Sequence, residues 1–70
     1  MSARDEFRDP VEMLRHDLRS PLTVITGFAD LLALDHRLSA EQRKDYAKRI
    51  SAAADEIRRL LDEAAAEAES

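Results

Sequence analysis

The chain has no cysteine and only one glycine, two prolines and three aromatic residues in 70 positions. Without cysteine it has no disulfide, no thiolate metal site and no cysteine nucleophile. So few glycines, prolines and aromatic residues favour helices over an all-β fold. No apolar run approaches the ~20 residues of a membrane-spanning helix, and no signal peptide is visible. We therefore expect a soluble helical segment without membrane contact, although its parent protein could be membrane-bound.

The small size and acidic balance of the chain restrict its partners. A core built from so few residues rarely contributes more than about 3–5 kcal/mol of stability, so self-association is expected where disulfides are absent. The formal net charge is −4, from 15 acidic and 11 basic residues. This charge argues against nucleic acid as a partner, because nucleic acid requires a basic face.

The first half of the sequence predicts one helix over about residues 10–34. Asp9 followed by Pro10 is typical of an N-cap and first helical position. Residues 1–9 are then a helical lead-in or a cut end, and the helix could already begin near Asp5. Apolar residues recur at steps of three and four, which defines a helical seam. The predicted seam consists of Val11, Leu14, Leu18, Leu22 or Pro21, Ile25, Phe28 with Ala29, and Leu32.

The second half predicts another helix over about residues 40–67, after a loop at 35–39. Ser39 and Gln42 match a capping box. We expect Asp55 and Arg59, four residues apart, to form an ion pair. The second seam consists of Tyr46, Ile50, Ala53, Ile57, Leu60 with Leu61, and Ala64.

Two helices of this length with a short loop form an antiparallel hairpin. One hairpin cannot cover both apolar seams, whereas two copies can cover them as a four-helix bundle with two-fold symmetry. We therefore predict an all-α hairpin at residues 10–67 that homodimerises.

The segment from Arg15 to Leu22 has the sequence Arg-His-Asp-Leu-Arg-Ser-Pro-Leu. It places a histidine, a serine and a helix-disfavouring proline within the first predicted helix. Pro21 removes the hydrogen bond to the carbonyl of Asp17 and should bend the helix. Ser20 and Thr23 flank this bend, where their hydroxyls could bond freed carbonyls. His16 is predicted to point away from the seam, toward water or a partner.

The pattern His-Asp-x-x-Ser-Pro resembles the H-box of sensor histidine kinases, and the hairpin resembles their dimerisation and histidine-phosphotransfer domain. The resemblance implies that His16 accepts the γ-phosphate of ATP and that Asp17 orients the imidazole and stabilises its positive charge. It implies a helix kink at Pro21. Ser20, at the position that is often threonine or asparagine in relatives, is the candidate for a role in receiver dephosphorylation.

The resemblance also implies partners. The chain has a single glycine, Gly27, and no glycine-rich ATP-binding boxes, so it has no ATP-binding domain and no cofactor or metal of its own. ATP and Mg²⁺ would bind a separate catalytic domain in cis or in trans. A response-regulator receiver domain would take the phosphoryl group in the cytoplasm. The expected receiver contacts are Arg15, Arg19, Thr23, Thr26, Asp30, Arg43, Ala47 and Ile50.

Two other readings remain open at the level of the sequence. The chain could be a structural dimeric module with a vestigial H-box, or a stand-alone phosphotransfer protein. His36 lies in the predicted loop without a matching motif, so we expect a solvated residue there. Asp17 has no metal-ligand spacing with Asp30, Asp35 or His36.

Overall fold

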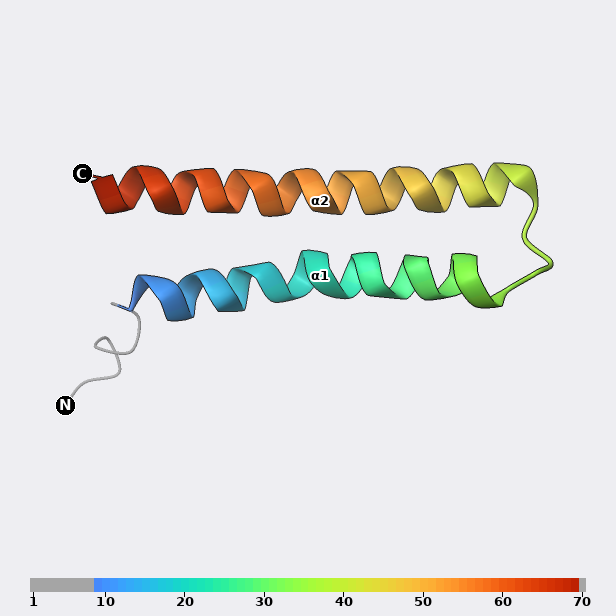
Figure 1. Ribbon diagram of the computed structural model, residues 1–70, viewed down its shortest axis with the longest axis horizontal. Helices are drawn as coiled ribbons and strands as arrows, with labels where there is room; N and C mark the ends of the chain where they lie inside the picture. The colour runs from blue at the N-terminus through green and yellow to red at the C-terminus, as the bar shows by residue number, and fades with distance from the viewer. Residues whose placement is uncertain (1–8, 70) are drawn as a thin grey trace.

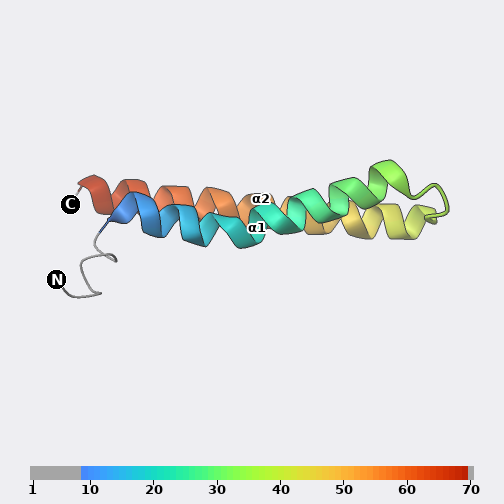
Figure 2. The ribbon, with the colours of Figure 1, turned by 90° about the horizontal axis from the view of Figure 1, so that it is seen from below.

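The structure is a computed structural model that describes residues 9–69. Two α-helices, α1 (Pro10–Leu34) and α2 (Ala40–Glu69), are joined by residues 35–39. They run antiparallel and lie side by side along their length, as both ribbon views show (Figures 1 and 2). The predicted all-α hairpin is therefore confirmed. Of the predicted lead-in at residues 1–9, residues 1–8 lie outside the described residues.

Both helices begin at the caps that the sequence predicts. Oδ1 of Asp9 accepts hydrogen bonds from the backbone N–H groups of Val11 at 3.0 Å and Glu12 at 3.4 Å. At α2, Oγ of Ser39 accepts from the N–H of Gln42 at 3.0 Å, and Oε1 of Gln42 accepts from the N–H of Ser39 at 2.8 Å. This reciprocal pair satisfies two amide groups that a helix start otherwise leaves without partners.

The connection between the helices is ordered by the backbone and side chain of Asp35. Its N–H donates to the carbonyl of Leu31 at 3.0 Å and closes the last turn of α1. Its Oδ1 then accepts from the N–H of Arg37 at 3.0 Å, which forms an Asx-turn. These two bonds turn the chain within five residues, and the helices are brought together as neighbours.

The interface between α1 and α2 consists of the predicted seams, with a correction at their edges. On α1 the buried or half-buried seam residues are Leu14, Leu18, Pro21, Ile25, Phe28 and Leu32, and on α2 they are Tyr46, Ile50, Ala53, Ile57, Leu60 and Ala64. Val11, Leu22, Ala29 and Leu61 were expected on or beside the seams and are exposed. At 3.6 residues per turn these four lie on the flanks of the helices, off the line that joins the two axes.

Pro21 is buried in the seam, and α1 continues through it as one helix. In Figure 2 the axis of α1 changes direction within its cyan segment, which includes the residues around position 20. The hydroxyl of Thr23 donates to the carbonyl of Arg19 at 2.9 Å. Our expectation that Thr23 would bond the carbonyl freed by proline is therefore wrong, because that carbonyl belongs to Asp17. A threonine hydroxyl in a helix reaches the carbonyl four residues before it, and for Thr23 this is Arg19.

An aromatic cluster fixes the register of the two helices. The ring centroids of Phe28 and Tyr46 lie 4.9 Å apart, and the guanidinium of Arg49 lies 5.7 Å from the Phe28 centroid. Nε of Arg49 also donates to Oδ2 of Asp45 at 2.9 Å, and this hydrogen bond and the carboxylate charge raise the pKa of Arg49. Because Arg49 stays protonated, its contact with Phe28 marks one side of the hairpin with a fixed positive charge.

Candidate functional site

His16 lies on α1 opposite the surface that packs against α2. The nearest seam residues, Leu14 and Leu18, are two positions before and after it, so at 3.6 residues per turn they face the other way. The imidazole is 82% exposed. The helix thus presents His16 to solvent, as the spacing of the predicted seam indicates, while its backbone is held in the hairpin.

Asp17 is the charged group beside the imidazole. Its Oδ1 lies 3.7 Å from Nδ1 of His16, and its side chain is 53% exposed. This separation is longer than a hydrogen bond. The imidazole nevertheless lies with Nδ1 toward the carboxylate. On an imidazole ring Nε2 lies across from Nδ1, so the second nitrogen remains available to a reactant in solvent. Adjacent residues on a helix project their side chains in different directions. The rotamer of the His16 side chain brings the imidazole near the carboxylate of Asp17 despite this difference.

Ser20 and Pro21 follow one turn after His16 and face different ways. Ser20 is four residues from His16, so both lie on the exposed side of α1, whereas Pro21 is buried against α2. Within residues 9–69 the hydroxyl of Ser20 forms no hydrogen bond with another side chain or the backbone. The segment therefore presents the exposed hydroxyl of Ser20 on the same side of α1 as the imidazole, while the adjacent proline packs against α2.

The two arginines beside His16 differ in their pairing. Nη1 of Arg15 contacts Oε1 of Glu12 at 3.2 Å. Among the described residues Arg19 forms no ion pair. Both side chains are exposed, so an incoming phosphate would find Arg19 unpaired and would have to compete with Glu12 for Arg15.

The remaining expected partner contacts lie along more than one surface. Thr23, Thr26 and Asp30 are exposed on α1, and Arg43 and Ala47 are exposed on α2. The contact between Phe28 and Tyr46 places Ala47 level with the second half of α1, about 18 Å along the axis from His16 at 1.5 Å per residue. The structure therefore places Arg43 and Ala47 far along the hairpin from the imidazole and not directly beside it.

Three exposed apolar residues of α1 lie outside the seam that the sequence predicts. Val24, Leu31 and Leu34 are 37%, 42% and 75% exposed. Leu34 follows His16 by 18 residues, which is about five full turns, so both project in nearly the same direction. The 18-residue spacing is the sequence signal for this second apolar direction, and it lies on the side of α1 opposite the seam toward α2.

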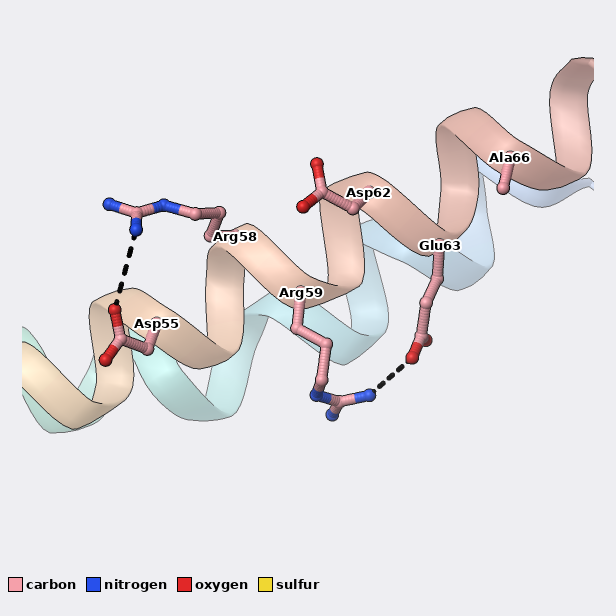
Figure 3. Close-up of a pocket in the computed structure, with 6 residues that line it drawn as sticks. All are labelled: Asp55, Arg58, Arg59, Asp62, Glu63 and Ala66. Atoms are coloured by element: carbon pink, nitrogen blue, oxygen red, sulfur yellow. Dashed lines mark hydrogen bonds and ion pairs between the residues drawn. The ribbon is translucent and has the colours of Figure 1, made fainter.

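Charged side chains along α2 form local ion pairs instead of a ligand site. The shallow depression in Figure 3 is lined only by α2 residues, namely Asp55, Arg58, Arg59, Asp62, Glu63 and Ala66. The expected pair between Asp55 and Arg59 is wrong. Arg59 instead contacts Glu56 and Glu63, each at 2.7 Å, and Asp55 lies 3.8 Å from Arg58. Arg59 has Glu56 before it and Glu63 after it along the helix, and these two carboxylates pair with it in place of Asp55.

Residues 9–69 contain no group of three or more histidine, aspartate or glutamate side chains that is placed to hold a metal ion. Neither described helix combines the length and apolar character needed to cross a membrane.

Comparison with known proteins agrees with the geometry. Residues 5–68 match the family model HisKA, described as the His Kinase A (phospho-acceptor) domain. No curated protein and no solved structure matches the chain. The match covers nearly the whole sequence and includes His16, Asp17 and both helices of the hairpin. The chain therefore belongs to the His Kinase A (phospho-acceptor) domain family.

Proposed function

We propose that this chain is the phosphoacceptor and dimerisation domain of a two-component sensor histidine kinase, with His16 as the residue that carries phosphate. The observation that carries the proposal is the arrangement at His16, where an exposed imidazole turns Nδ1 toward Asp17 and leaves Nε2 open. An ATP-binding catalytic domain, in the same chain or a partner chain, supplies the phosphoryl group. We place these steps in the cytoplasm, where ATP is available.

In the first step Nε2 of neutral His16 attacks the γ-phosphorus of ATP in line. The N–P bond forms as the bond from phosphorus to the bridging oxygen of ADP breaks, and ADP leaves with that electron pair. Positive charge develops on the imidazole, and the carboxylate of Asp17 beside Nδ1 stabilises it. Mg²⁺ would be bound with ATP by the catalytic domain and neutralise phosphate charge there.

In the second step a receiver aspartate attacks the phosphorus of phosphohistidine. The O–P bond forms, the N–P bond breaks, and the imidazole leaves as the neutral group that began the cycle. Arg19 lies one turn from His16 and is positioned to interact with phosphate charge. The exposed hydroxyl of Ser20, on the same side of α1, would orient water for dephosphorylation of the receiver.

The dimer forms on the flank of the hairpin that holds Val11, Leu22, Ala47 and Leu61. Ala47 and Leu61 are 14 residues apart on α2, and Val11 and Leu22 are 11 apart on α1, so each pair shares one helix face. Within residues 9–69 only Pro21 and Ala53 are buried in the single hairpin. A second copy would cover the large exposed side chains Val11, Leu22 and Leu61.

A structural module with an inactive H-box is the second candidate, because the hairpin and its exposed flank serve a dimer without chemistry at His16. The two functions differ in one measurement. We would incubate the chain with labelled ATP and the catalytic domain of its parent, and we would compare His16→Gln with His36→Gln. The loop residue His36 is also exposed and is the matched control.

We expect acid-labile, base-stable label in the wild type and in His36→Gln, and none in His16→Gln. Circular dichroism of all three proteins tests that the helices persist. Absence of label from a folded wild-type dimer, with a catalytic domain that binds ATP, would contradict the phosphoacceptor role and leave the structural module.

A further inference from the structure

Glu12 lies one turn before His16 on the exposed side of α1. The two positions are four residues apart, so their directions differ by about 40° and their Cβ atoms are separated by about 6 Å. Both side chains reach solvent, with 64% of the Glu12 side chain and 82% of the His16 side chain exposed. Glu12 thus brings a negative charge close to the imidazole on the side of α1 that faces away from α2.

The direction of the His16 side chain adds to this proximity. In an α-helix every Cα–Cβ bond tilts toward the N-terminus, so a side chain covers the turn that precedes its own Cα. For His16 that turn holds Glu12, whereas Ser20 lies on the turn that follows. A phosphoryl group on the imidazole would therefore lie close to the carboxylate of Glu12.

Glu12 also holds Arg15, the arginine directly before His16. Nη1 of Arg15 donates to Oε1 of Glu12 at 3.2 Å, and 74% of the arginine side chain is exposed. An exposed ion pair of this kind contributes little to stability, because water screens it. A phosphoryl group offers an arginine more charge and two oxygens for paired hydrogen bonds. Arg15 can therefore exchange Glu12 for phosphate, and the exchange takes its arginine partner from Glu12.

We propose that Glu12 raises the phosphoryl-transfer potential of phosphorylated His16, because its carboxylate repels the phosphoryl group and competes with it for Arg15. This inference rests on the proposed phosphorylation of His16. A phosphoryl group adds about two negative charges at pH 7. Its repulsion by Glu12 and the loss of the pair between Glu12 and Arg15 both disfavour the phosphorylated state. Neither effect acts on the neutral imidazole.

Reversal of the first step measures this transfer potential. A terminal oxygen of the β-phosphate of ADP attacks the phosphorus of phosphohistidine, the O–P bond forms, and the N–P bond breaks. The imidazole leaves with that electron pair as the neutral group, and ATP is the product. A receiver aspartate that attacks the same phosphorus draws on the same energy. Glu12 therefore favours onward transfer of the phosphoryl group over its accumulation on His16.

The test measures the equilibrium between the parent kinase and its phosphorylated form at a fixed ratio of ATP to ADP, without a receiver. Each protein reaches equilibrium from both sides, once from the unphosphorylated form and once from the phosphorylated form. Agreement of the two final fractions shows that the fraction depends on the energy of phosphohistidine and not on the rate of catalysis. The proteins compared are the wild type, Glu12→Gln, Arg15→Gln and the double variant.

Glu41→Gln is the matched control. Glu41 is the acidic residue in the first turn of α2, as Glu12 is in the first turn of α1, so both variants lose the same charge near a helix N-terminus. The contact between Phe28 and Tyr46 places Glu41 about 25 Å along the hairpin axis from His16, well beyond the screening length of about 8 Å. Both variants should lower the Tm by the same small amount, and Glu41→Gln should leave the equilibrium unchanged.

We expect Glu12→Gln to raise the equilibrium constant for phosphorylation of His16 by about fivefold, since it removes a repulsion that water only partly screens. The increase should shrink as the salt concentration rises. Arg15→Gln should lower the constant by about twofold in the wild type and about fivefold in the Glu12→Gln background, where the arginine is free to bind phosphate. A purely structural role for Glu12 would change the Tm without changing this equilibrium.

The outcomes distinguish this inference from the proposed function. Wild-type kinase without label on His16 overturns both. Equal equilibrium constants for Glu12→Gln and the wild type, with His16 labelled in each, overturn the role of Glu12 and leave the proposed function intact. An equal rise in Glu41→Gln overturns that role as well, because the effect would then follow net charge. An equal effect of Arg15→Gln in both backgrounds overturns the exchange of Arg15 between Glu12 and phosphate.

Discussion

Nδ1 of His16 lies 3.7 Å from Oδ1 of Asp17, although the two residues are adjacent on a helix. Both groups are more than half exposed, so water screens their attraction before a partner binds. When a catalytic domain covers the site, water is displaced and the same carboxylate interacts more strongly with a developing imidazolium. We therefore expect Asp17 to contribute little to the resting hairpin, and under the proposed function it would act mainly during phosphoryl transfer.

The first prediction concerns Asp17→Asn, which keeps the size of the side chain and removes its charge. Phosphorylation of His16 should slow by about 10²-fold or more, which is the usual contribution of a general acid–base partner. Helicity and Tm should stay close to wild type because the carboxylate is exposed. Label uptake by the parent kinase measures the rate, and Asp30→Asn is the matched control. An unchanged rate would show that Asp17 does not assist the imidazole.

The second prediction concerns the start of α2. Ser39→Ala removes the side-chain oxygen that accepts from the N–H of Gln42, while the backbone N–H of residue 39 can still donate to Oε1 of Gln42, and the change should cost about 1 kcal/mol of stability. Ser51→Ala makes the same chemical change within α2 at an exposed position, where alanine is the better helix former. Thermal unfolding should therefore give a lower Tm for Ser39→Ala and an equal or higher Tm for Ser51→Ala. Equal Tm values for the two variants would mean that the N-cap does not stabilise α2.

The caps and the contact between the helices could be predicted because both depend on local chemistry or regular spacing. Asp9, Ser39 and Gln42 act on amide groups two or three residues away, and a short sequence motif specifies this geometry. Periodicity likewise identifies Leu14, Leu18 and Ile25 as one stripe. These features depend on helix geometry alone and need no knowledge of the partner helix.

Other features depended on choices that spacing does not determine. Leu22 and Pro21 are adjacent, and periodicity allowed either in the seam, but packing placed the proline ring against α2. Arg59 had carboxylates in reach at three and four residues on both sides, and its rotamer selected Glu56 and Glu63 over Asp55. The openness around Gly27 depends on where α2 lies, so the sequence named the glycine without showing that nothing approaches it.

The third prediction concerns the flank that we assign to the dimer. Leu61 is 46% exposed in the single hairpin, so glutamate there is tolerated by one chain but would be buried without a partner charge in a dimer. Leu61→Glu should convert the dimer to monomer at micromolar concentration, with partial loss of helicity. Sedimentation or light scattering measures the mass. Ala52→Glu, also an exposed position of α2, should remain dimeric.

Two results would contradict this assignment. If Leu61→Glu retains the dimer mass, the second copy packs on another surface. Met13→Glu then provides the comparison, because Met13 is 46% exposed and lies on the side of α1 that also carries Val24 and Leu31. Loss of the dimer in Met13→Glu alone would transfer the interface to that side and would place the second copy near Gly27.

The fourth prediction concerns Pro21→Ala, in which two effects on stability oppose each other. Alanine restores a donor for the carbonyl of Asp17 and removes the ring clash, a gain of up to about 3 kcal/mol. The loss of the buried ring costs about 0.8 kcal/mol for each methylene removed from the seam. The helix effect is larger, so the Tm should rise. Thr26→Ala, an exposed change in the same helix, gives the reference for a gain in helix propensity alone.

The same variant tests whether the bend positions His16. A straighter α1 would keep the leucine seam but rotate the exposed turn that holds His16, Asp17 and Ser20 relative to α2. Phosphorylation of His16 should then fall while the Tm rises, so that stability and activity change in opposite directions. A lower Tm would mean that ring packing against α2 outweighs the helix defect. A higher Tm with unchanged phosphorylation would limit Pro21 to a structural role, because the imidazole would then react equally well on a helix without the bend.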